Sequence, residues 1–328
     1  MNSSSSPNAS YLELQSENGD KKWQKVGVIS NSKSEGDGKN EHIAKPNEEK
    51  DHRTQLPLNI KNILSPNAKI KSDRRANYMY RHSSDKIDTN LLILLHGAGD
   101  SHLPFHALAK KMNIPQTATL SINANAMNRG FVTIPFDLGY TWFEEMEYTT
   151  GQTYDPSHPK RLATLNNASE KIDGLIDRII EETDNWMPER IFLFGYSAGA
   201  STAMNLCQKR AMFGKPALGG VVCVAGGFKG VEPNEDKVKE LIGRNPQYTP
   251  LLLMGGSKDV KYPVSMLKRD VQLYGNGQVV KAFIQEGKGH EMVHRKEEVK
   301  YMMEFFGEKT VRRTLAMEGW SEVSSFAS

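Results

Sequence analysis

Short apolar segments alternate along the chain with segments of helical periodicity, and this alternation constrains the fold more than any other feature. We expect strands at residues 91–95, 118–122, 191–194, 220–224, 251–254 and 279–284. Most of these runs are almost continuously apolar, which is typical of strands covered on both faces in a parallel sheet. We expect helices at residues 104–112, 161–183, 198–210, 234–243, 263–274 and 292–307. Strands that alternate with helices predict an α/β fold, in which a mostly parallel central sheet carries helices on both faces.

The two ends of the chain are expected to lie outside this domain. Residues 1–55 are rich in Ser, Asn, Lys, Glu and Gly. A segment of that composition buries too little apolar surface to offset its ordering entropy, so we predict a disordered extension. The domain is expected over residues 56–307, with an additional extended pair within residues 68–82. Residues 308–328 are expected to form a weakly ordered tail.

Charge and cysteine content narrow the class of protein. The net charge of +3 is too small to favour nucleic acid or an anionic membrane surface as a partner. No stretch approaches the roughly 18 apolar residues of a transmembrane helix, and the N-terminus lacks the pattern of a secretory signal. Cys207 and Cys223 lie in apolar stretches, which indicates buried free thiols and a reducing compartment. We therefore expect a cytoplasmic protein with no nucleic-acid partner and no stable membrane insertion.

The segment Ile191-Phe-Leu-Phe-Gly-Tyr-Ser-Ala-Gly-Ala200 carries the chemistry. Its G-x-S-x-G pentapeptide is common by chance, but here it follows an apolar strand and opens a helix, which is the setting of a nucleophile elbow. The sharp turn requires small neighbours for the serine, and Gly195, Gly199 and Ala200 are small. The alternative is a glycine-rich strand-to-helix turn in which Ser197 is chemically idle. The elbow indicates the α/β-hydrolase fold in particular.

Two candidate partners for Ser197 follow it in the chain. A serine hydroxyl attacks well only when a base removes its proton and a carboxylate orients that base. In this fold the acid and then the histidine lie on loops after later strands. Asp259 follows strand 251–254 through a glycine turn, and His290 follows strand 279–284 through a glycine loop. The alternative for Asp259 is an ordinary turn or helix-capping aspartate.

His290 also begins the segment His290-Glu-Met-Val-His294, which matches the zinc motif H-E-x-x-H. A zinc hydrolase of that type needs both histidines on one face of a helix, Glu291 as general base and a third ligand farther on. Gly287 and Gly289 place His290 at a loop-to-helix junction instead, and no histidine follows His294. A zinc metallohydrolase is therefore the lesser alternative, and we expect no metal and no organic cofactor.

The oxyanion of an acyl-transfer intermediate needs backbone N–H donors, and the sequence offers two. One belongs to Ala198, directly after the serine. The other is expected in the segment Leu94-Leu-His-Gly-Ala-Gly-Asp100, whose glycines let the backbone approach a substrate and in which Ala98 offers its amide. The alternative is a phosphate-binding loop, but the segment lacks the lysine and the spacing of a P-loop. His96 is expected to be structural.

The segments LHGAGD, GYSAGA, GGSKD and GKGHE, in this order and at these intervals, resemble the phospholipase/carboxylesterase branch of the α/β-hydrolases, which includes the acyl-protein thioesterases. The likeness covers roughly residues 90–307, and within the branch the chain is similar to uncharacterised fungal hydrolases. Two departures are visible. The family commonly has glutamine where Ala198 stands, and the histidine of its H-G-x-x-D segment is absent before Asp259. Neither departure removes a group that the chemistry uses.

The resemblance implies a serine hydrolase that cleaves carboxylic esters or thioesters through an acyl-enzyme. It makes Ser197 the nucleophile, His290 the base and Asp259 the orienting acid, with Ala98 and Ala198 as oxyanion donors. The implied partner is a small-molecule or acyl-protein ester, with lysophospholipids included. The alternative from a different class is a catalytically silent interaction protein of the same fold, whose N-terminal extension binds an unknown partner.

The apolar stretch 125–160 is expected to lie over the site. Within it, Trp142 and Phe143 belong to a Trp-Phe pair that also resembles the family, and they are candidate substrate-binding residues. The alternative is a packed insertion that touches no substrate.

Overall fold

The computed structural model of the protein describes residues 11–14, 22–25, 78–124, 132–133, 139–147, 149–183, 186–228, 247–274 and 279–313. By its contacts the chain divides into two units, Met1–Lys50 and Asp51–Ser328. In the first unit, β1 (Tyr11–Leu14) pairs antiparallel with β2 (Lys22–Lys25), inside the segment for which the sequence predicts disorder. A two-stranded hairpin by itself is only marginally stable in water. The expected boundaries at residues 55 and 307 stay predictions.

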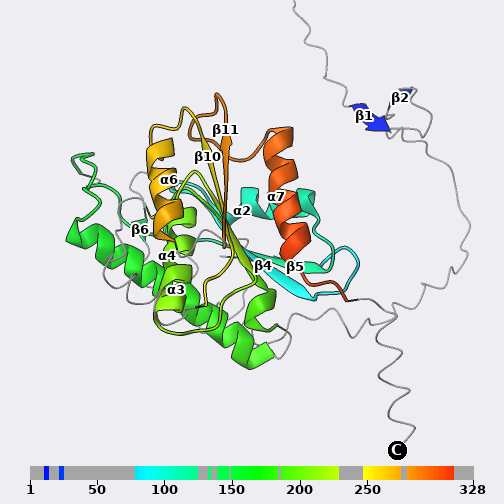
Figure 1. Ribbon diagram of the computed structural model, residues 1–328, viewed down its shortest axis with the longest axis horizontal. Coiled ribbons are helices and arrows are strands. Elements are labelled where there is room, and N and C mark those ends of the chain that lie inside the picture. Colours follow the sequence, from blue (N-terminus) through cyan, green and yellow to red (C-terminus); the bar gives the residue numbers. More distant parts are fainter. Residues whose placement is uncertain are drawn as a thin grey trace, which may run out of the picture. The chain divides into compact units, whose positions relative to one another are not determined.

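The second unit is built on a sheet that contains seven strands in the described part of the chain (Figure 1). In order across the sheet they are β11 (Val280–Gln285), β10 (Leu251–Gly256), β9 (Gly220–Val224), β8 (Ile191–Tyr196), β4 (Asn90–Leu95), β5 (Thr117–Ile122) and β3 (Tyr78–Arg81). All neighbours are parallel except β3, which pairs antiparallel with β5. All the strands expected from residue 91 onward are present, with ends shifted by two residues at most. The predicted mostly parallel sheet is confirmed.

Helices cover both faces of this sheet (Figure 1). They are α2 (His102–Met112) and α7 (Lys296–Lys309) on one face, and α3 (Pro159–Thr183), α4 (Ala198–Met212) and α6 (Val264–Leu273) on the other. The alternation of strand side chains produces the two layers. In β4, for example, Leu91 and Ile93 pack in the core that holds α3 and α4, whereas Leu92 and Leu94 pack with Phe105 of α2. The two faces are therefore both buried, as continuously apolar strands predict.

The smaller elements complete the described chain. The 3-10 helix η1 (Pro188–Arg190) leads into β8. The short strands β6 (Val132–Thr133) and β7 (Tyr140–Thr141) pair antiparallel. None of the helices in the described ranges combines the length and the apolar character that a membrane-spanning helix needs.

Two expectations of secondary structure need correction. Helix α7 begins at Lys296 rather than at residue 292, because the Glu298 carboxylate accepts the backbone N–H of Arg295 (3.1 Å) and so closes the first turn there. The extended pair expected within residues 68–82 is described only as β3, and its partner is β5, not a neighbouring strand in the chain. The helix expected at 234–243 lies outside the described residues.

The order of the strands reverses direction between β4 and β8. From β4 the chain passes to β5 on one side, and it later returns as β8 on the other side of β4. Loops that leave the carboxyl ends of two such strands diverge, and ligands in open α/β sheets bind in the crevice between them. The loop with Ala98 follows β4, and Ser197 follows β8.

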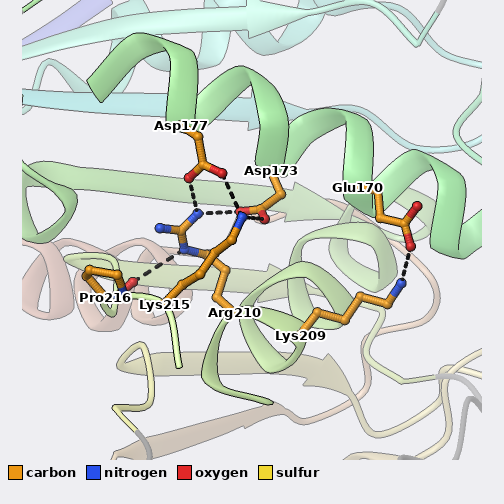
Figure 2. A network of polar contacts seen from close by, with 7 residues as sticks. All are labelled: Glu170, Asp173, Asp177, Lys209, Arg210, Lys215 and Pro216. Atoms are coloured by element: carbon orange, nitrogen blue, oxygen red, sulfur yellow. Dashed lines mark hydrogen bonds and ion pairs between the residues drawn. The ribbon is translucent and has the colours of Figure 1, made fainter. Parts of the chain in front are cut away.

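A group of charged side chains joins α3 to the end of α4 (Figure 2). Arg210, whose side chain is 2% exposed, contacts Asp173 and lies 2.9 Å from Asp177. The Lys215 ammonium lies 2.5 Å from Asp173 and 2.6 Å from Asp177. The Arg210 Nε also donates to the Pro216 carbonyl (3.3 Å). Two cations thus neutralise two carboxylates at the border of the core.

We expect Arg210→Met to lower the free energy of unfolding by about 2–3 kcal/mol, because it leaves two partly buried carboxylates, 17% and 31% exposed, with one cation. Urea unfolding followed by circular dichroism measures the loss. Lys209→Met is the matched control, since Lys209 pairs with the exposed Glu170 at 2.8 Å on the same two helices (Figure 2). That exposed pair should contribute less than about 1 kcal/mol. Equal losses in the two variants would contradict the prediction.

Candidate active site

Ser197 stands at the turn between β8 and α4, in the predicted strand–turn–helix arrangement. Its backbone has φ 50° and ψ −112°, a conformation that non-glycine residues rarely adopt. Two backbone hydrogen bonds hold it there: the Ser197 N–H donates to the Val224 carbonyl (2.9 Å), and the Ser197 carbonyl accepts the Ser201 N–H (3.0 Å). The surrounding structure therefore maintains a strained turn, in which Ser197 is almost buried (7% exposed).

Two glycines allow this turn to pack. A Cβ atom on Gly195 would lie 2.5 Å from the Gly199 carbonyl oxygen, and a Cβ atom on Gly199 would lie 2.3 Å from the Leu95 carbonyl oxygen. Contacts that short do not occur, so larger residues would push the helix away from the strands. The close approach to Leu95 also places the first turn of α4 directly against the loop that follows β4.

The structure brings the three expected catalytic residues into one chain of hydrogen bonds. His290 Nε2 lies 2.9 Å from Ser197 Oγ, and His290 Nδ1 lies 3.0 Å and 2.9 Å from the two carboxylate oxygens of Asp259. A carboxylate only accepts, so Nδ1 carries the proton and Nε2 is left to accept the serine O–H. The Asp259 side chain is fully buried, whereas 14% of the His290 side chain is exposed. The geometry suits proton transfer from Ser197 to His290.

Asp259 is held by the turn that follows β10. Its Oδ1 accepts the backbone N–H groups of Lys261 (2.9 Å) and Tyr262 (2.8 Å) in addition to the His290 contact. The side chain is therefore a turn aspartate and a partner of the histidine at once, and the two descriptions do not exclude each other. These three donors restrict the carboxylate to a single orientation.

The proposed oxyanion donors lie on the two neighbouring segments that follow β4 and β8. Ala198 is the first residue of α4, where backbone N–H groups have no acceptor within the helix. Ala98 is exposed in a tight turn, in which the Asp100 N–H donates to the Gly97 carbonyl (3.3 Å). The register of β4 and β8 pairs Leu95 with Gly195, so both loops leave the sheet at the same level.

His96 supports the loop that carries Ala98. Its Nδ1 lies 2.7 Å from the Gly97 carbonyl oxygen, and its Nε2 lies 3.0 Å from the backbone N of Ala124. Since the carbonyl can only accept and the amide can only donate, the ring is the neutral form with the proton on Nδ1. Burial lowers the pKa of His96, which also favours the neutral ring. His96 thus fixes the peptide between Gly97 and Ala98, as a structural residue would.

Trp142 and Phe143 lie elsewhere than the sequence interpretation suggests. Both side chains are fully buried in the core, and neither offers surface to a substrate. The Trp142 Nε1–H donates to the His96 carbonyl (2.7 Å), and the Phe143 ring faces the Arg161 guanidinium at 5.8 Å. A packed segment that supports the loop of Ala98 therefore describes these two residues better than substrate contact does. Much of the remaining stretch at 125–138 lies outside the described residues.

Tyr196 is a residue of the site that sequence reasoning missed. Its hydroxyl donates to the His290 carbonyl (3.1 Å), and its ring lies 5.6 Å from the His290 ring. A Cβ atom on Gly97 would lie 2.8 Å from this ring. Tyr196 therefore contacts both the histidine loop and the loop after β4. The G-x-S-x-G motif leaves its identity open, so the motif itself contains no signal for this role.

The segment His290-Glu-Met-Val-His294 is not helical, so its histidines do not share a helix face as the zinc motif requires. Both ring nitrogens of His290 face Asp259 and Ser197, whereas the His294 side chain is 52% exposed beside Glu291. Within the described ranges, no three His, Cys, Asp or Glu residues are grouped so that they could hold a metal ion. Cys207 and Cys223 are free and buried.

The sequence of this chain is similar to those of known hydrolases. A family model described as Phospholipase/Carboxylesterase matches residues 78–307. An uncharacterised hydrolase of Mycosarcoma maydis is 30% identical over 177 residues, which are 53% of this chain and 62% of that protein. An uncharacterised hydrolase of Schizosaccharomyces pombe is 29% identical over 147 residues, 43% of this chain and 54% of that protein. The chain thus matches less than two thirds of the length of either relative.

Solved structures agree with the architecture. The esterase PE8 superposes with a TM-score of 0.53 at 20% identity, over 70% of this chain and 97% of that one. The acyl-protein thioesterase 2 of Zea mays superposes with a TM-score of 0.51 at 16% identity, over 71% and 98%. At such low identity the likeness concerns the fold alone.

The buried neutral His96 makes stability depend on pH. Its folded-state pKa is lowered by burial, whereas the pKa of an unfolded histidine is about 6.5. At a pH between the folded and the unfolded pKa, the unfolded chain binds more protons than the folded one. The contribution of His96 to the free energy of unfolding is therefore complete above about pH 6.5 and decreases as the pH falls. We expect His96 to account for a loss of at most about 1.4 kcal/mol between about pH 7.5 and about pH 5.5.

Urea unfolding of wild type and His96→Gln at the two pH values tests this prediction. Glutamine does not titrate, so the variant should lose less stability over the interval, whatever its stability at the higher pH. Because all other titrating groups are common to both proteins, an equal loss in the two would show that His96 is not the responsible group.

Proposed function

The chain belongs to the phospholipase/carboxylesterase family of hydrolases, and we propose that it cleaves carboxylic esters or thioesters with Ser197 as the nucleophile. The observation that supports this proposal is the continuous set of hydrogen bonds from Ser197 through His290 to the buried carboxylate of Asp259. The three residues come from three loops at the carboxyl ends of β8, β10 and β11. That end of a parallel sheet is where α/β proteins bind their ligands.

In the proposed acylation step, His290 Nε2 takes the hydroxyl proton of Ser197 while the serine oxygen attacks the carbonyl carbon of the substrate. The imidazolium is stabilised by the Asp259 carboxylate at Nδ1. His290 then gives the same proton to the leaving alcohol or thiol, and the acyl group stays on the serine oxygen. In deacylation His290 takes a proton from water, the resulting hydroxide equivalent attacks the acyl carbon, and the proton returns to Ser197 as the acid leaves.

The N–H groups of Ala98 and Ala198 are the proposed donors to the oxyanion that forms in both steps. A preformed donor of this kind typically contributes a factor of about 100 to 1,000 in kcat. Both come from backbone that is packed in advance: Ala198 by the close contact of Gly199 with Leu95, and Ala98 by the His96 contact with Gly97. Since the backbone supplies these donors, alanine in place of the family's glutamine at 198 does not remove one.

The proposed substrates are esters and thioesters of carboxylic acids, and we include acyl-protein and lysophospholipid substrates among them. Their support is the sequence resemblance to the family and the name of the maize protein of comparable fold, an acyl-protein thioesterase. No step of this mechanism requires a metal ion or an organic cofactor. We also propose a cytoplasmic location, which the two free buried thiols support.

We expect a fluorophosphonate probe to label the wild-type protein and not Ser197→Ala, because the probe reacts only with an activated serine oxygen. Turnover of a panel of p-nitrophenyl esters and acyl thioesters of increasing chain length should fall by a factor of at least about 10,000 in the variant. Ser265→Ala changes an exposed serine of α6 and is the matched control, with labelling and turnover at the wild-type level.

The same experiment separates the alternatives. Folded wild type that neither labels nor turns over any ester would overturn the proposal in favour of a catalytically silent interaction protein. Activity that survives in Ser197→Ala, disappears with a chelator and returns with zinc would favour the metallohydrolase. Chain-length preference in the panel identifies the class of acyl group.

A further inference from the structure

A fully buried ion pair lies beside the proposed active site and has no part in the mechanism above. The Lys288 ammonium contacts the Glu298 carboxylate, and the two side chains are only 2% and 1% exposed. Lys288 stands two residues before His290 in the loop after β11, and Glu298 is in the first turn of α7. Lysine and glutamate are almost never buried to this degree unless they are paired. Removing both charges from water opposes folding, so their presence needs a reason other than stability.

The backbone of Lys288 is bound to the turn that carries Asp259. The Lys288 carbonyl accepts the Lys258 N–H at 2.8 Å. A Cβ atom on Gly256 would lie 2.1 Å from the same carbonyl oxygen, so the end of β10 is in direct contact with the loop. Because Lys258 directly precedes Asp259 in the chain, this hydrogen bond sets the position of Lys288 relative to the acid.

Glu298 connects the same loop to α7. Its Oε2 accepts the backbone N–H groups of Arg295 (3.1 Å) and His294 (3.3 Å), while its Oε1 contacts Lys288. The Arg295 guanidinium in turn donates to the Glu286 carbonyl (2.6 Å) at the start of the loop. One carboxylate thus ties the residues before His290 to the residues after it.

The loop needs such an anchor because glycines flank Lys288. Gly287 has φ 70°, a conformation that glycine adopts readily, and Gly289 separates Lys288 from His290. A backbone with two glycines has many accessible conformations and by itself would let the imidazole move. An error of about 1 Å in the position of a catalytic group can reduce the rate about 100-fold.

We infer that the buried Lys288–Glu298 pair positions His290 between Ser197 and Asp259. This inference rests on the proposed function for its kinetic consequence, but the order of the imidazole can be measured without turnover. Lys288 and Glu298 are positioning residues: neither touches the reacting atoms, and both act through the loop. A nonpolar pair could fill the same space, whereas the ion pair with its capping bonds selects one arrangement of the loop.

The test compares Lys288→Met, Lys288→Arg and the double variant Lys288→Met/Glu298→Gln with wild type. The single Met variant leaves a buried carboxylate unpaired and is expected to lower the thermal midpoint. The double variant removes both charges and retains a side-chain oxygen for the cap of α7, so it should recover most of the midpoint. We nevertheless expect its kcat to stay about 100-fold low, with KM changed less than about twofold. Lys288→Arg should recover part of kcat.

A matched control comes from the same strand and helix. Lys281 of β11 and Glu308 of α7 form an ion pair at 2.5 Å with both side chains about half exposed, 43% and 51%. Lys281→Met/Glu308→Gln should leave kcat, KM and the imidazole signal at wild-type values. An effect equal to that of the buried pair would show that any link between these elements suffices, and it would overturn the inference.

Proton NMR supplies the readout that does not depend on activity. The His290 Nδ1–H that donates to Asp259 should give a far-downfield signal in wild type, and this signal should broaden or vanish in the double variant. A folded double variant with wild-type kcat and an unchanged signal would overturn the inference and leave the proposed function standing. Wild type with the signal but without labelling or turnover would instead contradict the proposed function, while loss of the signal in the variant would still support positioning.

Discussion

The strained backbone of Ser197 depends on close packing between one helix and two neighbouring strands, and the rest of the site is arranged around that contact. A serine at φ 50° is unfavourable in isolation, and it persists here because its own N–H and carbonyl are both bound. The contact between Gly199 and the Leu95 carbonyl holds α4 against β4 at a distance that no larger residue permits. The same contact brings the first turn of α4 to the loop with Ala98. The same packing contact therefore positions both the nucleophile and the proposed oxyanion donors.

His290 and Asp259 lie on loops beside this turn. Hydrogen bonds and ion pairs hold these loops in place. Ser197 and His290 are 93 residues apart in the chain, and Asp259 and His290 are 31 apart. The parallel strands bring all three to one edge, because β8, β10 and β11 end on the same side. Backbone N–H groups orient Asp259, Tyr196 binds the His290 carbonyl, and Glu298 of α7 binds Lys288 within the loop of His290. The sheet brings the three residues to the same edge, and these contacts then determine the distances between their side-chain atoms.

The hydrophobic pattern predicted most of this architecture. The apolar strands and the periodic stripe of α3 specify which faces are buried, and their alternation leaves little choice but a parallel sheet with two covered faces. The order of the elbow, Asp259 and His290 along the chain then indicates which loops meet. The prediction was weaker where a local sequence pattern is compatible with two different structures. Trp142 is aromatic in a stretch beside the site, but it is fully buried under the loop of His96 and not on a substrate surface. The HEMVH segment matches a helical motif, yet Glu298 caps the helix only after the segment has ended.

The sequence by itself determined the parallel strands, the turn at Ser197 and the candidate partners Asp259 and His290, because hydrophobic periodicity and glycine spacing act locally and are visible in one dimension. Only the tertiary structure decided the pairing of Lys288 with Glu298, the contact of Tyr196 with the histidine loop and the tautomer of His96. Each of these joins atoms from separate elements, and its energy depends on burial, which the chain acquires only when those elements pack together. A lysine between two glycines looks like an exposed loop residue until α7 covers it.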